Sequence, residues 1–333
     1  MELRPIDITY TWCDDADSRW RRKRLETAAK FGVELTGHAN GDCRYRANDD
    51  LRFALRSLEQ CAPWINRVHL VVDDDITLPS WLNAAAPRLH VVRLSEIMPA
   101  AYLPCFCSGT IEQWLADIPG LADRFLVAND DCFFGRPVAP DFFFAGDGFP
   151  YVRLGGLKRE GDIRKNYVDY RMRLANSIGL LREAFGPSGS LDEIAARYPH
   201  HNIDAYCRDD FLACRERFAE KLLPTMAYPF RRSDQFQRVL YSGYALAVGH
   251  AHARLARNHA AVHRPWYKRL LVHGWAESLQ FLGKDWQYAE RQLMRYSPGL
   301  FCCNDTAATT DEDRRFLQAF YEKRFPRKSS FEL

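Results

Sequence analysis

The sequence lacks several features that assign a protein to a class at once. Its 333 residues carry a formal net charge of only +3, so bulk charge does not indicate a nucleic-acid partner. No apolar run approaches the roughly 20 residues that cross a bilayer, and there is no internal repeat or low-complexity segment. Because strand-like residues begin at Ile6 with no signal-peptide pattern before them, we expect a cytoplasmic protein, with the inner face of the cell membrane as the alternative.

Cysteine and lysine usage narrows the chemistry further. The ten cysteines include no Cys-x-x-Cys pair, so the sequence does not indicate a structural zinc site. Cys13 and Cys132 lie in apolar runs, where cysteine is typically a small buried hydrophobe. Lysine is scarce, since 37 of the 46 basic residues are arginine. Arginine is the better bidentate partner for phosphate, although a GC-rich genome produces the same bias.

Acidic residues follow three apolar, strand-like runs. After the runs 6–12, 68–72 and 125–128 come Asp14, Asp15, Asp17, Asp73, Asp74, Asp75, Asn129, Asp130 and Asp131. Buried parallel strands read as such runs, and α/β proteins bind ligands at the carboxyl ends of these strands. Neighbouring carboxylates repel each other unless a cation or a basic group lies between them. Two interpretations stay open: one shared metal-binding rim, which the threefold recurrence favours, and acids that merely start the turn after each strand.

The first 150 residues alternate between strand-like and helical patterns. Helical patterns cover residues 18–31 and 48–61, and further strands are expected at 67–72 and 89–94. This alternation predicts a sheet with crossover helices. We therefore expect an α/β fold with a mixed, mostly parallel sheet of Rossmann/GT-A-like type, a helical insertion and a helical C-terminal part.

The second half of the chain has weaker periodicity. Residues 151–200 are polar and contain several glycines, which indicates an insertion or lid. Helical patterns are expected over 204–223 and 250–296, and an amphipathic helix over 311–325 ends before Pro326.

Arginines surround the start of the helix expected at 48–61. Arg52 and Arg56 are four residues apart and share one face, and Arg44 and Arg46 precede the helix. Converging guanidinium groups at a helix N-terminus suit a pyrophosphate. Spacing alone favours the alternative, a solvated face with ion pairs.

Four blocks of the sequence resemble, in the same order, the conserved regions of the Stealth family. This family contains sugar-phosphate transferases of bacterial capsule synthesis and the catalytic subunit of the lysosomal N-acetylglucosamine-1-phosphotransferase. The blocks cover 6–20, 44–135, 199–204 with 230–233, and 301–305 with 325–332. The chain departs from the family pattern at two places. It has Cys107-Ser108 where an Asn-Ser pair is usual, and it has Asp15 where a glycine is usual.

The resemblance implies an enzyme, a phosphotransferase of capsule or cell-surface polysaccharide synthesis. It would transfer a hexose-1-phosphate or N-acetylhexosamine-1-phosphate from a nucleotide-sugar, expected to be a UDP-sugar, to a hydroxyl of a carbohydrate or lipid-linked glycan acceptor. The product would be a phosphodiester, and a nucleoside monophosphate would leave. Mg²⁺ or Mn²⁺ is the implied cofactor. No nucleic-acid partner is expected. Apart from the resemblance, the aromatic, basic run 264–269 fits contact with a membrane surface, as in peripheral membrane association, or with a glycan, and it fits packing beside a solvated edge equally well.

The resemblance also nominates site residues within a single catalytic domain of residues 1–333. In it, 1–150 would form the nucleotide-sugar-binding core, 151–200 the insertion or lid, and 201–333 the half that completes the active site. The catalytic candidates are His201 as base, Arg231 as phosphoryl ligand, Asp131 and Asp305. The metal candidates are Asp130, Asp131 and Asp305. The nucleotide-sugar candidates are Tyr10, Trp12, Asp14, Arg46, Asn48, Arg52, Arg56, Glu112 and Asn304.

Two alternatives to sugar-phosphate transfer remain open. A metal-dependent glycosyltransferase would use similar carboxylates and release a nucleoside diphosphate. A catalytically inactive homologue would bind glycans only, although the joint presence of His201, Arg231, Asp131 and Asp305 speaks against it.

Overall fold

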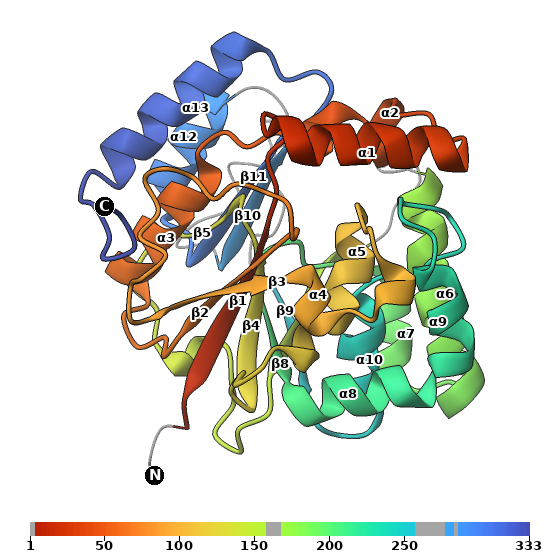
Figure 1. The fold of residues 1–333 in the computed structure, drawn as a ribbon. Coiled ribbons are helices and arrows are strands. Elements are labelled where there is room, and N and C mark those ends of the chain that lie inside the picture. The colour runs from red at the N-terminus through yellow and green to blue at the C-terminus, as the bar shows by residue number, and fades with distance from the viewer. Residues whose placement is uncertain (1–3, 158–167, 257–276, 283–285) are drawn as a thin grey trace.

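A central sheet of five strands organises the protein. The computed structural model describes residues 4–157, 168–256, 277–282 and 286–333 (Figure 1). The strand order is β3-β2-β1-β4-β8, formed by β1 (Ile6–Trp12), β2 (Val68–Val72), β3 (Leu89–Arg93), β4 (Arg124–Asn129) and β8 (Asp204–Cys207). The first four strands are parallel, and β8 runs antiparallel to β4. This topology confirms the expected mixed, mostly parallel α/β sheet.

Hydrophobic burial explains the central strands. All five residues of β2 are buried, and so are six of the seven of β1, as apolar runs covered on both faces should be. The connection from β1 to β2 contains α1 (Ser18–Phe31), α2 (Gly37–Asn40), the 3₁₀ turn η1 (Asp42–Arg44) and α3 (Asp50–Cys61). The helices expected at 18–31 and 48–61 are therefore confirmed, to within two residues at the start of α3.

Short helical turns connect β3 to β4. They are α4 (Leu94–Ile97), η2 (Ala100–Tyr102), α5 (Ser108–Ile111) and η3 (Glu112–Asp117). The strand expected at 89–94 ends one residue early, because Leu94 already begins α4.

A second sheet of three strands continues directly from the first. Its order is β10-β11-β5, formed by β10 (Ser278–Leu282), β11 (Leu300–Asn304) and β5 (Cys132–Phe134). Figure 1 shows this sheet beside the C-terminal helices α12 (Trp286–Tyr296) and α13 (Asp311–Arg324). Phe133 of β5 stacks on Phe301 of β11 at 4.8 Å between ring centroids, and both belong to the hydrophobic core that also contains β1.

The middle of the chain forms a third packed unit. After η4 (Pro140–Phe142) come β6 (Tyr151–Leu157), α6 (Val168–Phe185), α7 (Gly189–Ala196), β7 (Arg197–Pro199), α8 (Arg208–Arg217), α9 (Ala219–Met226), α10 (Val239–Ala247) and β9 (His252–Leu255). The strands pair in the order β7-β6-β9, and Leu174, Ile194 and Leu246 belong to a core of their own.

Two expectations for the second half were wrong in part. The stretch expected to be helical at 204–223 begins with β8, because Asp204–Cys207 complete the edge of the central sheet. The stretch expected to be helical at 250–296 contains β9 and β10, whose pairing to β6 and β11 overrides local propensity. The run 264–269 lies outside the described residues. In the part of the chain that the structure describes, no helix is long and apolar enough to span a bilayer.

The C-terminal residues 329–333, called the C-terminal strap below, bind to α3 and hold it in position. Leu82 and Glu332 form an antiparallel bridge, and the Leu333 amide donates to the Trp81 carbonyl at 2.9 Å. The buried carboxylate of Glu332 accepts from Arg56 Nε and Nη2, both at 2.7 Å, and from Arg52 Nε at 2.8 Å. The strap thereby fixes the helix whose first turn lies at the candidate site.

Candidate active site

The Asp130–Asp131 turn lies at the junction of two sheets. β4 ends at Asn129 and β5 begins at Cys132, so the two aspartates form the link between the central sheet and the β10-β11-β5 sheet. β8 pairs with β4 in the register Val127–Asp204, which brings the residues before Asp204 to the same edge. β11 ends there with Asn304, because it runs antiparallel to β5. Segments from three parts of the chain therefore meet at this edge.

Asn304 connects two of the catalytic candidates. Its Nδ2 donates to Asp131 Oδ2 at 2.8 Å and lies 3.4 Å from His201 Nε2. In this arrangement Nε2 of His201 accepts and is the basic nitrogen, while Nδ1 carries the proton. Asn304 therefore sets the tautomer of the histidine, a role different from the nucleotide-sugar contact expected for it.

The surroundings of His201 favour a neutral imidazole. Burial lowers the pKa of His201 below its ordinary value, the nearby Asp131 carboxylate opposes this effect, and the Arg238 guanidinium adds to it. Arg238 is itself held by Asp204 Oδ2 at 2.9 Å and by Glu112 Oε1 at 3.5 Å. A neutral histidine whose basic nitrogen faces the site can accept a proton at neutral pH.

The acidic edge carries unbalanced negative charge. Burial raises the pKa of Asp130 well above its ordinary value, and the carboxylates of Asp131 and Asp50 raise it further. Asp50, in the first turn of α3, has its pKa raised to about 7 by burial first and then by Asp131. Like charges that are held together without a basic partner are the usual signature of a cation site.

The three metal candidates do not form one preassembled ligand set. Among the described residues, the only group of three or more His, Cys, Asp or Glu ligand atoms within 4.8 Å of one another consists of Asp131, Cys132 and Cys302. Asp305 instead accepts from the Thr306 amide at 2.8 Å and pairs with Arg314 Nε at 3.4 Å. The ligand set Asp130, Asp131 and Asp305 therefore stays a prediction, for which the Asp130–Asp131 turn supplies the oxygen donors that fit a hard divalent cation.

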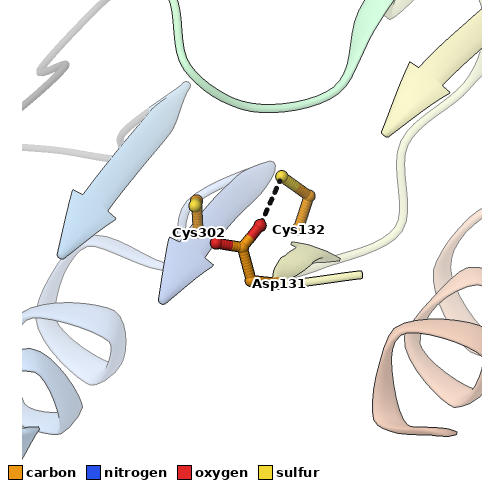
Figure 2. A group of neighbouring side chains, drawn as sticks. All are labelled: Asp131, Cys132 and Cys302. Atoms are coloured by element: carbon orange, nitrogen blue, oxygen red, sulfur yellow. Dashed lines mark hydrogen bonds between the residues drawn. The ribbon is translucent and has the colours of Figure 1, made fainter. Parts of the chain in front are cut away.

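The sulfur atoms beside Asp131 do not suit such a cation. Cys132 and Cys302 face each other across β5 and β11, and Cys132 Sγ donates to Asp131 Oδ1 at 3.5 Å (Figure 2). Burial raises the pKa of the Cys302 thiol well above its ordinary value. A hydrogen bond with Cys302 lowers the pKa of the Cys132 thiol, but burial and the Asp131 charge together outweigh it and the net shift is upward. Protonated thiols are hydrogen-bond donors rather than metal ligands, so the pair fits a role in orienting Asp131.

Arg231 presents a positive charge without an ionic partner. Its Nη1 donates to the Ala39 carbonyl at 3.2 Å and the Tyr45 hydroxyl at 3.3 Å, and its Nη2 donates to Ser108 Oγ at 2.9 Å. All these acceptors are neutral, and Arg231 forms no salt bridge with any carboxylate in the described part of the chain. A positioned, unneutralised guanidinium is suited to an anionic ligand.

Electrostatic coupling places Arg231 near the acidic edge. Burial raises the pKa of the Cys13 thiol, the Asp130 carboxylate raises it further, and the Arg231 guanidinium opposes both. The Glu112 carboxylate acts on the pKa of both Arg231 and His201. The Asp130–Asp131 turn, His201 and Arg231 therefore belong to one group of interacting residues, called the constellation below.

The acids after β1 and β2 have structural partners. Asp17 caps α1 by accepting from the amides of Arg19 and Trp20, both at 2.9 Å. Asp73 and Asp75 pair with Lys23. The carboxyl ends of β1, β2 and β4 lie at one edge of the sheet. A helix cap, ion pairs and local hydrogen bonds such as Ala16 to Asp14 and Ser95 to Asp74 involve the acids after β1 and β2, so the Asp130–Asp131 turn is the remaining candidate for the metal-binding rim.

Four of the nucleotide-sugar candidates have structural positions. Tyr10 is fully buried and Trp12 is 8% exposed, so both belong to the core under β1. Arg52 donates to Glu332 of the C-terminal strap through Nε, and Arg56 donates to it through Nε and Nη2. Both arginines form ion pairs with the buried carboxylate of Glu332 rather than with a solvated neighbour, and contact of these four residues with a nucleotide-sugar stays a prediction.

The other candidates surround the constellation. Asn48 Nδ2 lies 3.5 Å from Asp305 Oδ2, and buried Glu112 pairs with Arg238. Arg46 is exposed and lines a cavity beside Asp305. Half-buried Asp14 accepts from the Ala16 amide at 3.0 Å in the turn after β1.

Sequence reasoning missed several residues that shape the site. Arg238, Tyr45 and Ser108 hold or surround the candidates. Tyr45 and Ser108 lie in the second family block, so only their roles were missed, whereas Arg238 lies outside every block and no sequence signal identifies it. Asp50 had a detectable signal, because Asn48-Asp49-Asp50 repeats the Asn-Asp-Asp triplet at 129–131.

Comparisons with known proteins agree with this geometry. Residues 44–152 match the model for Stealth protein CR2, conserved region 2, and residues 292–333 match Stealth protein CR4, conserved region 4. The chain belongs to the Stealth family. The CR2 match contains Asp50, Asp130 and Asp131, and the CR4 match contains Asn304 and Asp305.

Curated relatives in the Stealth family extend the similarity over the whole chain. Exopolysaccharide phosphotransferase cps2G of Lactiplantibacillus plantarum is 27% identical, with 98% of this chain and 96% of the relative covered. Exopolysaccharide phosphotransferase SCO2594 of Streptomyces coelicolor is 31% identical over 98% of this chain and 51% of the relative. Capsular polysaccharide phosphotransferase SacB of Neisseria meningitidis serogroup A is 27% identical over 98% and 57%. The chain thus spans about half the length of the latter two.

Solved structures offer only a distant likeness for this Stealth protein. The galactosyltransferase LgtC in complex with donor and acceptor sugar analogues has a TM-score of 0.47 and 12% identity, with 97% of this chain and 96% of that chain covered. A TM-score and a sequence identity this low do not support an argument about function.

Proposed function

We propose that this Stealth protein is a sugar-1-phosphate transferase of capsule or cell-surface polysaccharide synthesis. It transfers a hexose-1-phosphate or N-acetylhexosamine-1-phosphate from a nucleotide-sugar, for which a UDP-sugar is the first choice, to a hydroxyl of a carbohydrate or lipid-linked glycan. The observation that carries the proposal is the combination of unneutralised Arg231 with the neutral His201 that Asn304 joins to Asp131. The phosphotransferase names of the relatives support the same reaction class.

The reaction assigns each group a separate task. The acceptor hydroxyl replaces the 3.4 Å contact from Asn304 at Nε2 of His201 and gives its proton to that nitrogen, while its oxygen forms a bond to the sugar-bearing phosphorus. The bond from that phosphorus to the nucleotide oxygen breaks, and the nucleoside monophosphate leaves with the electron pair. Arg231 holds the equatorial oxygens of the phosphoryl group, where negative charge is greatest. The proton-accepting group therefore need not contact the donor.

A divalent cation, Mg²⁺ or Mn²⁺, is part of the proposal. Asp130 and Asp131 would hold it, with Asp305 as a further ligand, and when bound it would neutralise pyrophosphate charge. The cytoplasmic location, peripheral membrane association and absence of a nucleic-acid partner stay predictions.

The released nucleotide tests the proposal directly. The purified protein is incubated with Mg²⁺, a glycan mixture and a panel of UDP-, GDP- and ADP-sugars, and the released nucleotide is identified by chromatography. The expected product is a nucleoside monophosphate, accompanied by a phosphodiester signal in ³¹P NMR. A nucleoside diphosphate would instead identify a glycosyltransferase, and glycan binding without any nucleotide release would identify an inactive glycan-binding homologue.

A further inference from the structure

A cavity beside Asp305 has no role in the constellation described so far. It has a volume of about 560 Å³ and lies between the segment after α1 and the start of α13. Figure 1 shows the first turn of α13 at the same end of the molecule as α1 and α2. The lining includes Thr36, Asp42, Arg46, Thr306, Asp311 and Arg314. Its volume falls within the range of about 300–1,000 Å³ that small-molecule sites typically have.

The cavity is contiguous with the candidate active site. Thr306 directly follows Asp305, and Arg314 Nε lies 3.4 Å from Asp305 Oδ2. The opposite wall belongs to the segment that holds Arg231, because Asn40 Oδ1 accepts from the Arg231 amide at 3.1 Å. A ligand in this cavity therefore lies between the segment that follows Asp305 and the segment whose Asn40 contacts Arg231.

The charges of the lining do not favour an anion. Two carboxylates, Asp42 and Asp311, balance two guanidinium groups, Arg46 and Arg314. Arg314 is already committed, since it donates to Asp311 Oδ1 at 2.6 Å as well as to Asp305 and to a backbone carbonyl. A pyrophosphate needs a net positive surface, so the nucleotide part of a donor does not fit this lining.

The start of α13 is also closed to an anion. A capping box occupies the N-terminus, in which Thr310 Oγ1 accepts from the Asp313 amide at 3.2 Å and Asp313 Oδ2 accepts from the Thr310 amide at 2.8 Å. The first turn adds Asp311, Glu312 and Asp313, whose charges repel phosphate.

We infer that this cavity is the subsite for a neutral hexose ring of the carbohydrate acceptor. The inference rests on the proposed function and adds the location and chemistry of its acceptor site. The wall supplies threonine hydroxyls, carboxylates and the Arg46 guanidinium, which exchange hydrogen bonds with sugar hydroxyls without requiring a charged ligand. A ring held there brings the acceptor to Asp305, at the edge of the constellation that contains His201.

A pair of neighbouring alanines provides a matched test. Ala307 lines the cavity, whereas Ala308 does not, and both are exposed in the same turn. Ala307→Trp should fill the cavity, and Ala308→Trp should leave it open. Binding of methyl α- and β-hexopyranosides and their N-acetylamino analogues is measured by saturation-transfer NMR without donor, with uridine monophosphate as a second probe. We expect wild type and Ala308→Trp to bind at least one glycoside, Ala307→Trp to bind it about tenfold more weakly or not at all, and all three to bind uridine monophosphate alike.

Several results would overturn the inference. If no glycoside binds to the wild type, or if Ala307→Trp binds as well as wild type, the cavity is not a sugar subsite. If Ala307→Trp loses uridine monophosphate instead, the cavity is a nucleotide site. Nucleotide release from the donor panel reports separately on the proposed function: glycoside binding that depends on Ala307, without any nucleotide release, would leave a glycan site in a protein of another activity.

Discussion

His201 shows how one side chain acquires a chemical role from its neighbours. Burial and the Arg238 charge lower its pKa, and Asn304 turns its basic nitrogen toward the site. Any cation bound at Asp131 would lower the pKa further, because it favours the neutral imidazole. Nothing in the local sequence contains this information.

We predict that His201→Ala slows transfer far more than it weakens donor binding. Loss of a positioned base removes about 10²–10⁴-fold in rate, while the donor keeps its contacts with Arg231. In wild type the basic form persists below the ordinary histidine pKa of 6.5, so activity should fall only at more acidic pH, and this acidic limb should vanish in the variant. Turnover between pH 5 and 8, with donor affinity by calorimetry, checks this prediction. Exposed His250→Ala is the control. Loss of donor binding in a folded His201 variant would make the histidine a donor contact.

Arg231→Lys should be nearly as damaging as Arg231→Ala. The planar guanidinium donates to Ser108, Tyr45 and Ala39 and still has its charge available for a ligand. A single ammonium group cannot make these three hydrogen bonds and bind a phosphoryl group at the same time. We expect a loss of about 10²–10³-fold in turnover for both variants. The neighbouring Arg232, an exposed residue paired with Asp234, supplies the control, because Arg232→Lys should stay near wild type. Near-normal turnover of the Arg231 lysine variant would mean that a diffuse positive charge is sufficient.

At the scale of the secondary-structure elements, the C-terminal strap holds α3 in position. The strap residues 329–333 have no regular secondary structure of their own beyond the bridge at Glu332, yet they bury its carboxylate between two arginines. The first turn of α3 carries Asp50, and Asn48 just before it contacts Asp305. Loosening the strap is therefore expected to disturb the site at a distance.

Glu332→Gln should destabilise the fold and remove part of its acid sensitivity. Burial raises the pKa of Glu332, but the hydrogen bonds from Arg56, the Ser329 amide and Arg52 outweigh it and lower the pKa from 4.5 to about 2. A depressed pKa contributes stability that is fully present above about pH 4.5 and is lost as the pH falls toward 2. That gap corresponds to about 3 kcal/mol, and breaking a buried pair costs a similar amount.

Urea unfolding at pH 7 and at pH 4 measures this effect. The wild type should lose stability between the two values more steeply than Glu332→Gln. Glu26→Gln, at an exposed position of α1, is the control and should follow wild type. Equal pH dependence in the Glu332 variant and wild type would show that the strap ion pair does not govern acid sensitivity.

At the scale of the whole molecule, the junction of the two sheets concentrates carboxylates that form no salt bridge with the residues the structure describes. Asp50 comes from α3, and Asp130 and Asp131 come from the turn between β4 and β5. The Asp131 carboxylate raises the pKa of both Asp50 and Asp130, and Asp50 raises that of Asp130 as well. A ligand that binds only the folded state stabilises it by mass action. A cation at this junction should therefore be visible in the unfolding of the whole protein.

We predict that millimolar Mg²⁺ or Mn²⁺ raises the Tm by about one to a few degrees. Asp130→Asn should abolish this rise and should also raise the Tm in excess chelator, because it removes repulsion from Asp131 and Asp50. Differential scanning calorimetry measures both effects, with exposed Asp123→Asn as the control. A cation-dependent rise that persists unchanged in Asp130→Asn would locate the cation elsewhere.

The sequence by itself determined the parts that depend on local pattern. Apolar runs predicted β1, β2, β3 and β4, and for β1, β2 and β4 the physical reason is that strands buried on both faces are apolar almost throughout. Helical periodicity predicted α1, α3 and α13. The conserved blocks were sufficient to indicate the family, since they are contiguous stretches that need no structure to be recognised.

Only the tertiary structure decided what each charged group does. Asp17, Asp73 and Asp130 look alike in sequence, yet the first caps a helix, the second pairs with Lys23, and the third forms no salt bridge with any of the described residues. β8 and β10 are strands only because a distant strand supplies their hydrogen bonds. Arg56 meets Glu332 across 276 positions of sequence, and no periodicity reports such a contact. The free energy of a charge depends on the groups around it in space, and the fold alone decides which groups those are.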